Sequence, residues 1–159
     1  MENQFKLTEI DAWLLLSILY SKKKNGTFDL KHVIEVGDII QHSIFEYEEI
    51  NIGIGRLILT GYLSISKEKI TVTEEAEKIL KAIEMREGIA SPIKRFQQLK
   101  KELQIIENNV ESGIRNDNYS INLTEYISKQ EYQYAIKGEV KRVNFLKKTL
   151  KILAIKKGN

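Results

Sequence analysis

The segment from Tyr47 to Gly61 constrains the fold of this chain more than any other stretch. Its aliphatic residues Ile50, Ile54 and Leu57 recur at steps of four and three, which is the spacing of one apolar side of an amphipathic helix. Gly61 stands where a residue in the left-handed conformation commonly ends a helix. The pattern therefore predicts a helix that ends just before Gly61 and packs one side against a core.

A small β-hairpin is predicted directly after this helix. Residues 62–65 and 70–72 alternate between apolar and polar side chains, and the polar turn 66–69 separates them. This is the pattern of two short paired strands. Thr73 then has the position of an N-cap for a further helix that runs to about Arg86.

Two helices are predicted before the 47–61 segment. Thr8 followed by Asp11 has the spacing of a capping box. The run behind it is apolar on nearly all sides to about Lys24, which is typical of a helix in the centre of a domain. Asp29 has the residue type and position of an N-cap for a second helix over residues 30–41.

The order of helix, helix, turn, helix, hairpin and helix comes with two sequence features. The third helix leads out through Gly-Arg-Leu-Ile-Leu-Thr-Gly-Tyr-Leu at residues 55–63, and the hairpin ends in Ile-Thr-Val-Thr-Glu-Glu-Ala at residues 70–76. In these features the chain resembles winged helix-turn-helix transcription regulators of the PadR and MarR kind. The resemblance implies a winged-helix domain over residues 1–90, a third helix that reads double-stranded DNA, and a homodimer.

Residues 91–159 are predicted to form a C-terminal appendage of two helices, so that the chain is mainly α-helical. The pair Ser91-Pro92 suits the N-cap and first position of a helix to about Val110, and Ser128 begins a last helix that reaches Lys151 or beyond. The apolar residues of the first appendage helix form a seam of two heptads, which is too short for a free coiled coil. We expect the seam to pack on the domain, to pair with a second copy, or both.

The charge is divided unevenly along the chain. Residues 1–90 carry 11 Lys and Arg against 15 Asp and Glu, a net charge of −4, whereas residues 91–159 carry 14 against 7, a net charge of +7. A protein that binds nucleic acid concentrates positive charge on the side that meets phosphates. Here the predicted DNA-reading half is acidic, which argues against DNA as its partner.

The outward side of the third helix carries acidic and apolar side chains, among them Glu48, Ile52 and Leu59. A helix that reads a major groove usually offers basic or amide side chains instead. Each glycine inside a helix costs about 1 kcal/mol relative to alanine, so Gly53 and Gly55 favour a close approach by another backbone, with a tolerated surface glycine as the alternative. The outward strip favours contact with the C-terminal helix, a second subunit or a different protein, and scattered exposed aliphatic residues are the alternative.

Two sets of candidate contact residues follow from these patterns. The candidates for contact with DNA are Tyr47, Glu48, Asn51, Ile52, Arg56, Lys67 and Lys69. The candidates for contact with a protein partner or a second copy are Ile52, Gly55, Leu59, Phe96, Leu99, Leu103, Ile106, Leu146 and Leu150.

Residue patterns for catalysis are missing from the sequence. His32 and His42 have no carboxylate arrangement around them that would form a metal site or a general base, so we expect neither enzymatic activity nor a cofactor or metal. The chain has no cysteine, which favours a reducing compartment. The apolar run 12–20 is too short to cross a bilayer, and we expect a cytoplasmic protein without a membrane partner.

Two functions remain open on this basis. The first is a DNA-binding transcription regulator of the winged-helix type, which rests mainly on the resemblance. The second is a winged-helix protein–protein interaction module that does not bind DNA, which rests on the acidic and apolar outward side of the third helix.

Overall fold

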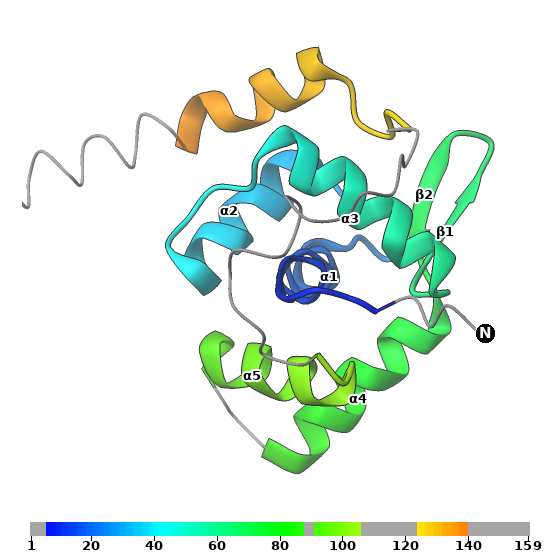
Figure 1. Cartoon of the computed structure of the whole chain (residues 1–159), viewed down its shortest axis with the longest axis vertical. Coiled ribbons are helices and arrows are strands. Elements are labelled where there is room, and N and C mark those ends of the chain that lie inside the picture. Colours follow the sequence, from blue (N-terminus) through cyan, green and yellow to red (C-terminus); the bar gives the residue numbers. More distant parts are fainter. Residues whose placement is uncertain (1–5, 88–90, 106–123, 140–159) are drawn as a thin grey trace, which may run out of the picture.

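The computed structural model describes residues 6–87, 91–105 and 124–139. It has a mainly helical architecture with one two-stranded antiparallel hairpin (Figure 1). The elements in chain order are α1 Glu9–Ser21, α2 Leu30–Gln41, α3 Tyr47–Leu59, β1 Leu63–Ser66, β2 Lys69–Val72, α4 Glu74–Glu87 and α5 Pro92–Glu102. Residues 129–139 are also helical. Within the described residues, no helix is long and apolar enough to cross a membrane.

Helix α1 lies at the centre of the molecule, with α2 and α3 on one side and α4 and α5 on the other (Figure 1). Its apolar side chains are buried all round, as expected for a helix without a polar face. The predicted capping box is confirmed, since the Thr8 amide donates to Asp11 Oδ2 at 2.7 Å and the Asp11 amide donates to Thr8 Oγ1 at 3.3 Å. The helix ends at Ser21, earlier than the predicted Lys24, and a turn closed by Gly26 at φ +82° follows.

Helix α3 and the hairpin agree closely with the prediction. The helix ends at Leu59 and Gly61 adopts a left-handed φ of +83°, and the strands pair with Ile65 opposite Ile70. The hydroxyl of Thr73 donates to the Gly61 carbonyl oxygen at 2.7 Å, which connects the start of α4 to the end of α3. Local spacing alone was enough to predict this part of the fold.

Helix α5 packs on the body of the protein, which is one of the arrangements that the sequence left open. Phe96 and Leu99 are buried in the same core as the residues of α1. The predicted continuation of this helix to about Val110 is wrong, because α5 ends at Glu102. The amide of Ile105 donates to the Lys100 carbonyl and the amide of Gln104 to the Lys101 carbonyl, both at 3.0 Å, a Schellman motif with Gln104 at φ +54°.

Candidate interaction site on helix α3

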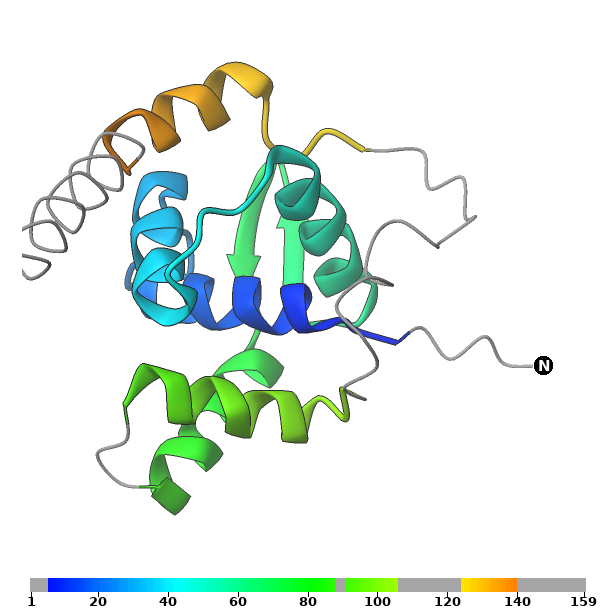
Figure 2. The same ribbon diagram turned by 60° about the vertical axis from the view of Figure 1, so that its left-hand side comes forward.

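The outward side of α3 carries a row of residues at steps of four, Tyr47, Asn51, Gly55 and Leu59, which we call the outer row. Residues 124–128, which we call the strap, contact the first three members of this row. The helical stretch 129–139 follows the strap and lies beside α2 and α3, at the opposite end of the molecule from α4 and α5 (Figure 2). The strap therefore covers Tyr47, Asn51 and Gly55 of the outer row and leaves Leu59 exposed.

Asn51 holds the backbone of the strap with both ends of its side-chain amide. The Ile127 amide donates to Asn51 Oδ1 at 2.8 Å, and Asn51 Nδ2 donates to the Ile127 carbonyl oxygen at 3.3 Å. Asn51 is 2 % exposed, and its Nδ2 also donates to the Tyr47 carbonyl oxygen at 3.1 Å. A buried amide with its donor and its acceptor satisfied contributes to stability, whereas an unsatisfied one is costly.

Tyr47 makes a second anchor for the strap. Its hydroxyl donates to Glu125 Oε1 at 2.6 Å, and its ring meets that of Tyr132 edge to face, with centroids 5.8 Å apart. Tyr132 in turn donates to the Phe45 carbonyl oxygen at 2.7 Å. The hydrogen bond to Glu125 raises the pKa of Tyr47 to about 12, and the same bond lowers the pKa of Glu125.

The glycines of α3 face two different neighbours. A Cβ atom on Gly55 would lie 3.3 Å from Cε2 of Tyr126, and one on Gly53 would lie 2.6 Å from Cδ2 of Leu14. Gly55 therefore lets the strap approach the outer side of α3, and Gly53 lets α1 approach the inner side. The predicted approach of a backbone is wrong, because the nearest atoms at both glycines belong to side chains.

Arg56 lies on the inner side of α3, contrary to its prediction as a DNA contact. Its Nη1 is 3.4 Å from Asp11 Oδ2, and the side chains of Arg56 and Asp11 are only 6 % and 1 % exposed. Burial raises the pKa of the Asp11 carboxyl, while the positive charge of Arg56 acts in the opposite direction. Asn51 is likewise buried under the strap. Neither side chain is presented to solvent on the outward side of α3.

Carboxylates gather at the start of α3 beside the strap, where Lys129 Nζ also lies 5.9 Å from the centroid of the Tyr47 ring. Glu48 is exposed, and the negative charges of Glu46 and Glu48 add to partial burial in raising the pKa of Glu49. The same three carboxylates add to burial in raising the pKa of Tyr132. A negative potential at this end of α3 disfavours an approaching phosphate.

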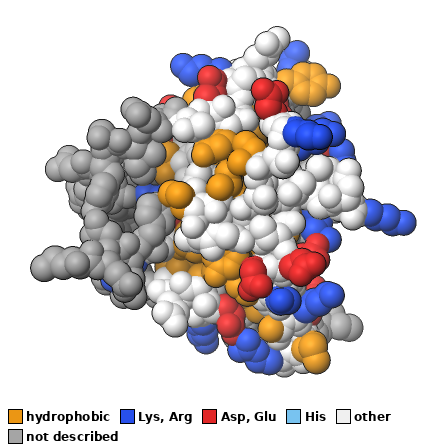
Figure 3. Space-filling view, turned by 90° about the vertical axis from the view of Figure 1, so that its right-hand side faces the viewer, with side chains coloured by type: hydrophobic (Ala, Val, Ile, Leu, Met, Phe, Trp, Pro, Cys, Tyr) orange, Lys and Arg blue, Asp and Glu red, His pale blue; other side chains and the backbone are white. Residues whose placement is uncertain are grey.

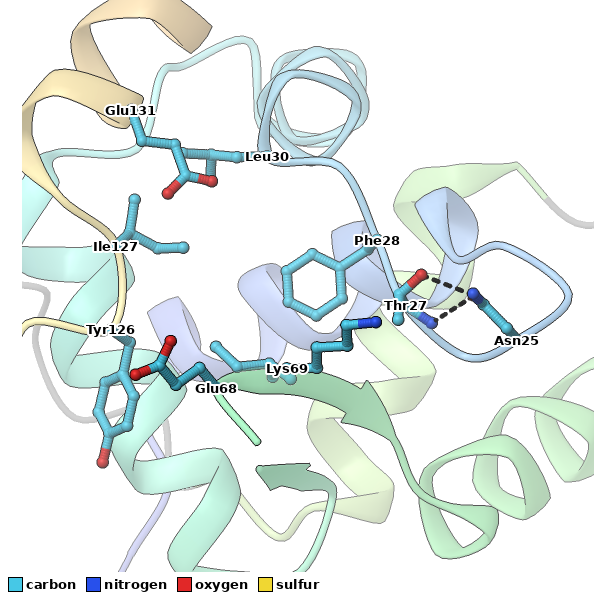
Figure 4. A pocket seen from close by; sticks show the side chains of 10 residues that line it. Asn25, Thr27, Phe28, Leu30, Glu68, Lys69, Tyr126, Ile127 and Glu131 are labelled. Atoms are coloured by element: carbon cyan, nitrogen blue, oxygen red, sulfur yellow. Dashed lines mark hydrogen bonds between the residues drawn. The ribbon is translucent and has the colours of Figure 1, made fainter. Parts of the chain in front are cut away.

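A cleft of about 340 Å³ lies beside the strap, between the tip of the hairpin and the segment that enters α2 (Figure 4). Glu131 and Ile127 come from the C-terminal segment, Phe28 comes from the segment before α2, and Glu68 and Lys69 come from the hairpin. Lys67 and Glu68 form the two-residue turn with left-handed φ angles of +48° and +62°. Lys67 and Lys69 are exposed, as their prediction as contact residues requires.

The remaining predicted partner contacts fall into three groups. Leu59 is 74 % exposed and Ile52 is half-buried, and Figure 3 shows hydrophobic side chains gathered at the centre of the molecular face on the side of α3 and the hairpin. Phe96 and Leu99 are buried within the chain, and Leu103 is half-buried against the same core. Ile106, Leu146 and Leu150 lie outside the described residues.

The sequence did not predict the strap residues Glu125, Tyr126 and Ile127, which stand directly before the helix predicted to begin at Ser128. The available signal is their composition, since an aromatic and an aliphatic residue stand together immediately before the N-cap Ser128 in a polar stretch. The predicted capping by Ser128 is confirmed in one direction, because the Glu131 amide donates to Ser128 Oγ at 3.1 Å.

Comparisons of the chain with protein-family models, curated proteins and solved structures give no match.

The hydrogen bond between Tyr47 and Glu125 gives a testable pKa. Glu125→Gln removes the charged acceptor, so the pKa of Tyr47 should fall from about 12 toward the ordinary tyrosine value of about 10. The phenolate absorbance of each protein is followed at alkaline pH, with the matching Tyr47→Phe protein as the blank. Glu131→Gln is the control and should leave the pKa of Tyr47 at about 12; a Tyr47 in the unaltered protein that titrates near 10 contradicts the contact.

Both groups stabilise the bound strap near neutral pH, and their contributions are lost in opposite directions of pH. Because the folded pKa of Tyr47 is raised, its contribution to strap binding is present below pH 10 and is lost as the pH rises through about 12. Because the folded pKa of Glu125 is lowered, its contribution is present above the ordinary glutamate pKa and is lost as the pH falls through the lowered value.

Proposed function

We propose that this protein is a winged-helix protein–protein interaction module whose α3 binds protein segments and not DNA. The observation that carries the proposal is the strap itself, which lies on Tyr47, Asn51 and Gly55. A DNA-reading third helix needs that surface for the groove of the duplex. In this chain a protein segment already occupies it.

The exposed chemistry around the strap supports the same proposal. DNA binding rests on Lys and Arg that neutralise phosphates, whereas Glu48 lies on the exposed side of α3 and Arg56 is paired inside with Asp11. Leu59 stands uncovered at the end of the outer row. Exposed acidic side chains at the start of α3 and an exposed apolar residue at its end suit a protein surface better than a polyanion.

A DNA-binding experiment tests the proposal. The unaltered protein is titrated with generic duplex DNA at about 50 and 200 mM salt, where phosphate contacts would weaken binding by orders of magnitude between the two conditions. We expect no binding at either salt concentration. Two results together would overturn the interaction module. The unaltered protein would bind DNA at low salt and not at high salt, and the double variant Lys67→Ala, Lys69→Ala would not bind at low salt.

The DNA-binding regulator remains the second candidate because of the element order. Helices α2 and α3 followed by the β1–β2 hairpin have the succession of a winged helix-turn-helix domain, and such a regulator would act on double-stranded DNA as a homodimer. In that function the strap has to leave α3 before DNA can bind. Repeating the titration with Tyr126→Ala, which weakens the strap, tests this: a gain of salt-dependent DNA binding in the variant favours the regulator.

A further inference from the structure

We propose that the outer row of α3 is a binding site for a short segment of a partner protein with an acidic, an aromatic and an aliphatic residue in succession, and that Glu125, Tyr126 and Ile127 are its resident occupant. The inference rests on the proposed interaction function and names the class of partner. It is carried by the way in which each strap residue is held and by the open space beside the strap.

The backbone of the occupant is recognised by Asn51. Its side-chain amide receives the N–H of Ile127 and donates to the C=O of the same residue, at 2.8 and 3.3 Å. The strap is bent at Tyr126 and Ile127, and the Tyr126 amide donates to the Thr124 carbonyl oxygen at 3.1 Å. Hydrogen bonds to main-chain groups do not depend on the identity of the side chain, so Asn51 can accept a segment with this backbone shape whose residue at this position has a free N–H.

The side chains of the occupant are selected by the neighbours of Asn51 on the outer row. The Tyr47 hydroxyl donates to the carboxylate of Glu125 at 2.6 Å, a charge-assisted bond that a neutral residue would not reproduce. One turn further on, the bare backbone of Gly55 leaves room for the ring of Tyr126. Ile127 is buried in the core cluster, which selects an aliphatic residue.

The site is larger than its resident occupant. The cleft of about 340 Å³ opens directly beside Tyr126 and Ile127 and is lined further by Phe28 and Ile70, a volume at the lower end of those that hold ligands. The uncovered Leu59 continues the outer row beyond Gly55. A partner segment that kept the strap contacts and added a side chain in the cleft or against Leu59 would gain contacts that the strap lacks.

The resident occupant belongs to the same chain, so its binding is intramolecular and it competes with a free peptide at a high effective concentration. A free peptide with the same sequence should therefore bind weakly to the unaltered protein. Weakening the strap should remove the competition and expose the site. In the natural complex, the partner's additional contacts would allow it to displace the strap.

The test uses the full chain and a fluorescent synthetic peptide with the sequence of residues 124–130. The strap-weakened double variant Glu125→Gln, Tyr126→Ala is expected to bind this peptide at least about tenfold more tightly than the unaltered protein does. A scrambled peptide of the same composition is the control and should not bind. Absence of binding to the double variant at millimolar peptide overturns the proposal.

A change in the peptide tests the role of Asn51 without any change in the protein. Methylating the backbone nitrogen of the isoleucine removes the donor to Asn51 Oδ1, so affinity for the double variant should fall at least about tenfold. Equal affinity of the methylated and unmethylated peptides overturns the assignment of Asn51.

If the unaltered protein sediments as a dimer that Tyr126→Ala dissociates, the occupant comes from a second copy and the partner-segment proposal is overturned. Failure of the peptide to bind does not overturn the proposed interaction function, because that function is overturned only by salt-dependent binding of DNA.

Discussion

Asp11→Ala is expected to lower the free energy of unfolding by about 3–5 kcal/mol, because it leaves the buried guanidinium of Arg56 without the carboxylate of Asp11. The two side chains lie 3.4 Å apart and join α1 to α3 inside the protein. Burial removes the water that would otherwise solvate the remaining charge. Urea unfolding of the two proteins at pH 7 measures the difference.

An exposed ion pair with the same separation provides the matched control. Lys78 and Glu75 are also 3.4 Å apart, but their side chains are 68 % and 70 % exposed, so Glu75→Ala should change the free energy of unfolding by at most about 1 kcal/mol. Asp11 additionally accepts a hydrogen bond from the Thr8 amide, and Asp11→Asn, which retains an acceptor oxygen, separates loss of charge from loss of the cap. Equal effects of Asp11→Ala and Glu75→Ala on the free energy of unfolding would show that burial does not determine how much the Asp11–Arg56 pair contributes to stability.

The buried pair also matters for the candidate site. Arg56 follows Gly55 directly, so the ion pair with Asp11 turns one side of α3 toward α1 and leaves the outer row facing the strap. Gly53 supports the same orientation, because only a residue without a side chain admits Leu14 at this distance. Helix α3 is therefore fixed about its own axis by contacts on the side opposite the site.

The parts of the fold that the sequence predicted are those encoded in local spacing. The stripe of Ile50, Ile54 and Leu57, the N-cap of α1 and the β1–β2 pairing each depend on residues a few positions apart. Gly61 signalled the end of α3 because its left-handed φ is one that glycine adopts readily. At the end of α5 the left-handed residue is Gln104, so the heptad spacing that continued beyond it misled the prediction.

The site itself depends on residues far apart in the chain, which periodicity does not connect. Asn51 and Ile127 are separated by 76 positions, and Arg56 and Asp11 by 45. The spacing along α3 does not reveal that Arg56 faces inward, because its partner Asp11 lies on a neighbouring helix. The sequence favoured a contact on the strip of Ile52, Gly55 and Leu59 and left the contacting group open; in the structure the strap meets Gly55, together with Tyr47 and Asn51, and leaves Leu59 uncovered.

Gly37→Ala is expected to destabilise the protein by about 2 kcal/mol. A Cβ atom at this position of α2 would lie 2.4 Å from Cε2 of Phe45, well inside van der Waals contact. Phe45 is fully buried, and its ring stacks on Trp13 with centroids 3.6 Å apart. Trp13 is itself held by a 2.9 Å hydrogen bond from its Nε1 to the Gly37 carbonyl oxygen.

The size of this effect follows from two opposing contributions. Alanine is favoured over glycine by about 1 kcal/mol inside a helix, whereas overpacking a rigid core costs about 1–3 kcal/mol and occasionally more. The ring of Phe45 cannot yield without displacing Trp13, because the two rings are stacked and both are buried. The overpacking cost is therefore at or above the upper end of its range and exceeds the gain in helix propensity.

Gly138→Ala provides the matched control, since it makes the same substitution in the helical stretch 129–139, where no atom lies within 4 Å of the added Cβ. Here only the helix propensity changes, so the free energy of unfolding should stay the same or rise by up to about 1 kcal/mol. Urea unfolding of both variants measures whether each substitution lowers or raises the free energy of unfolding. A stabilised Gly37→Ala protein would mean that Phe45 moves freely, and the Phe45 carbonyl that accepts the Tyr132 hydroxyl would then be a mobile anchor for the segment that follows the strap.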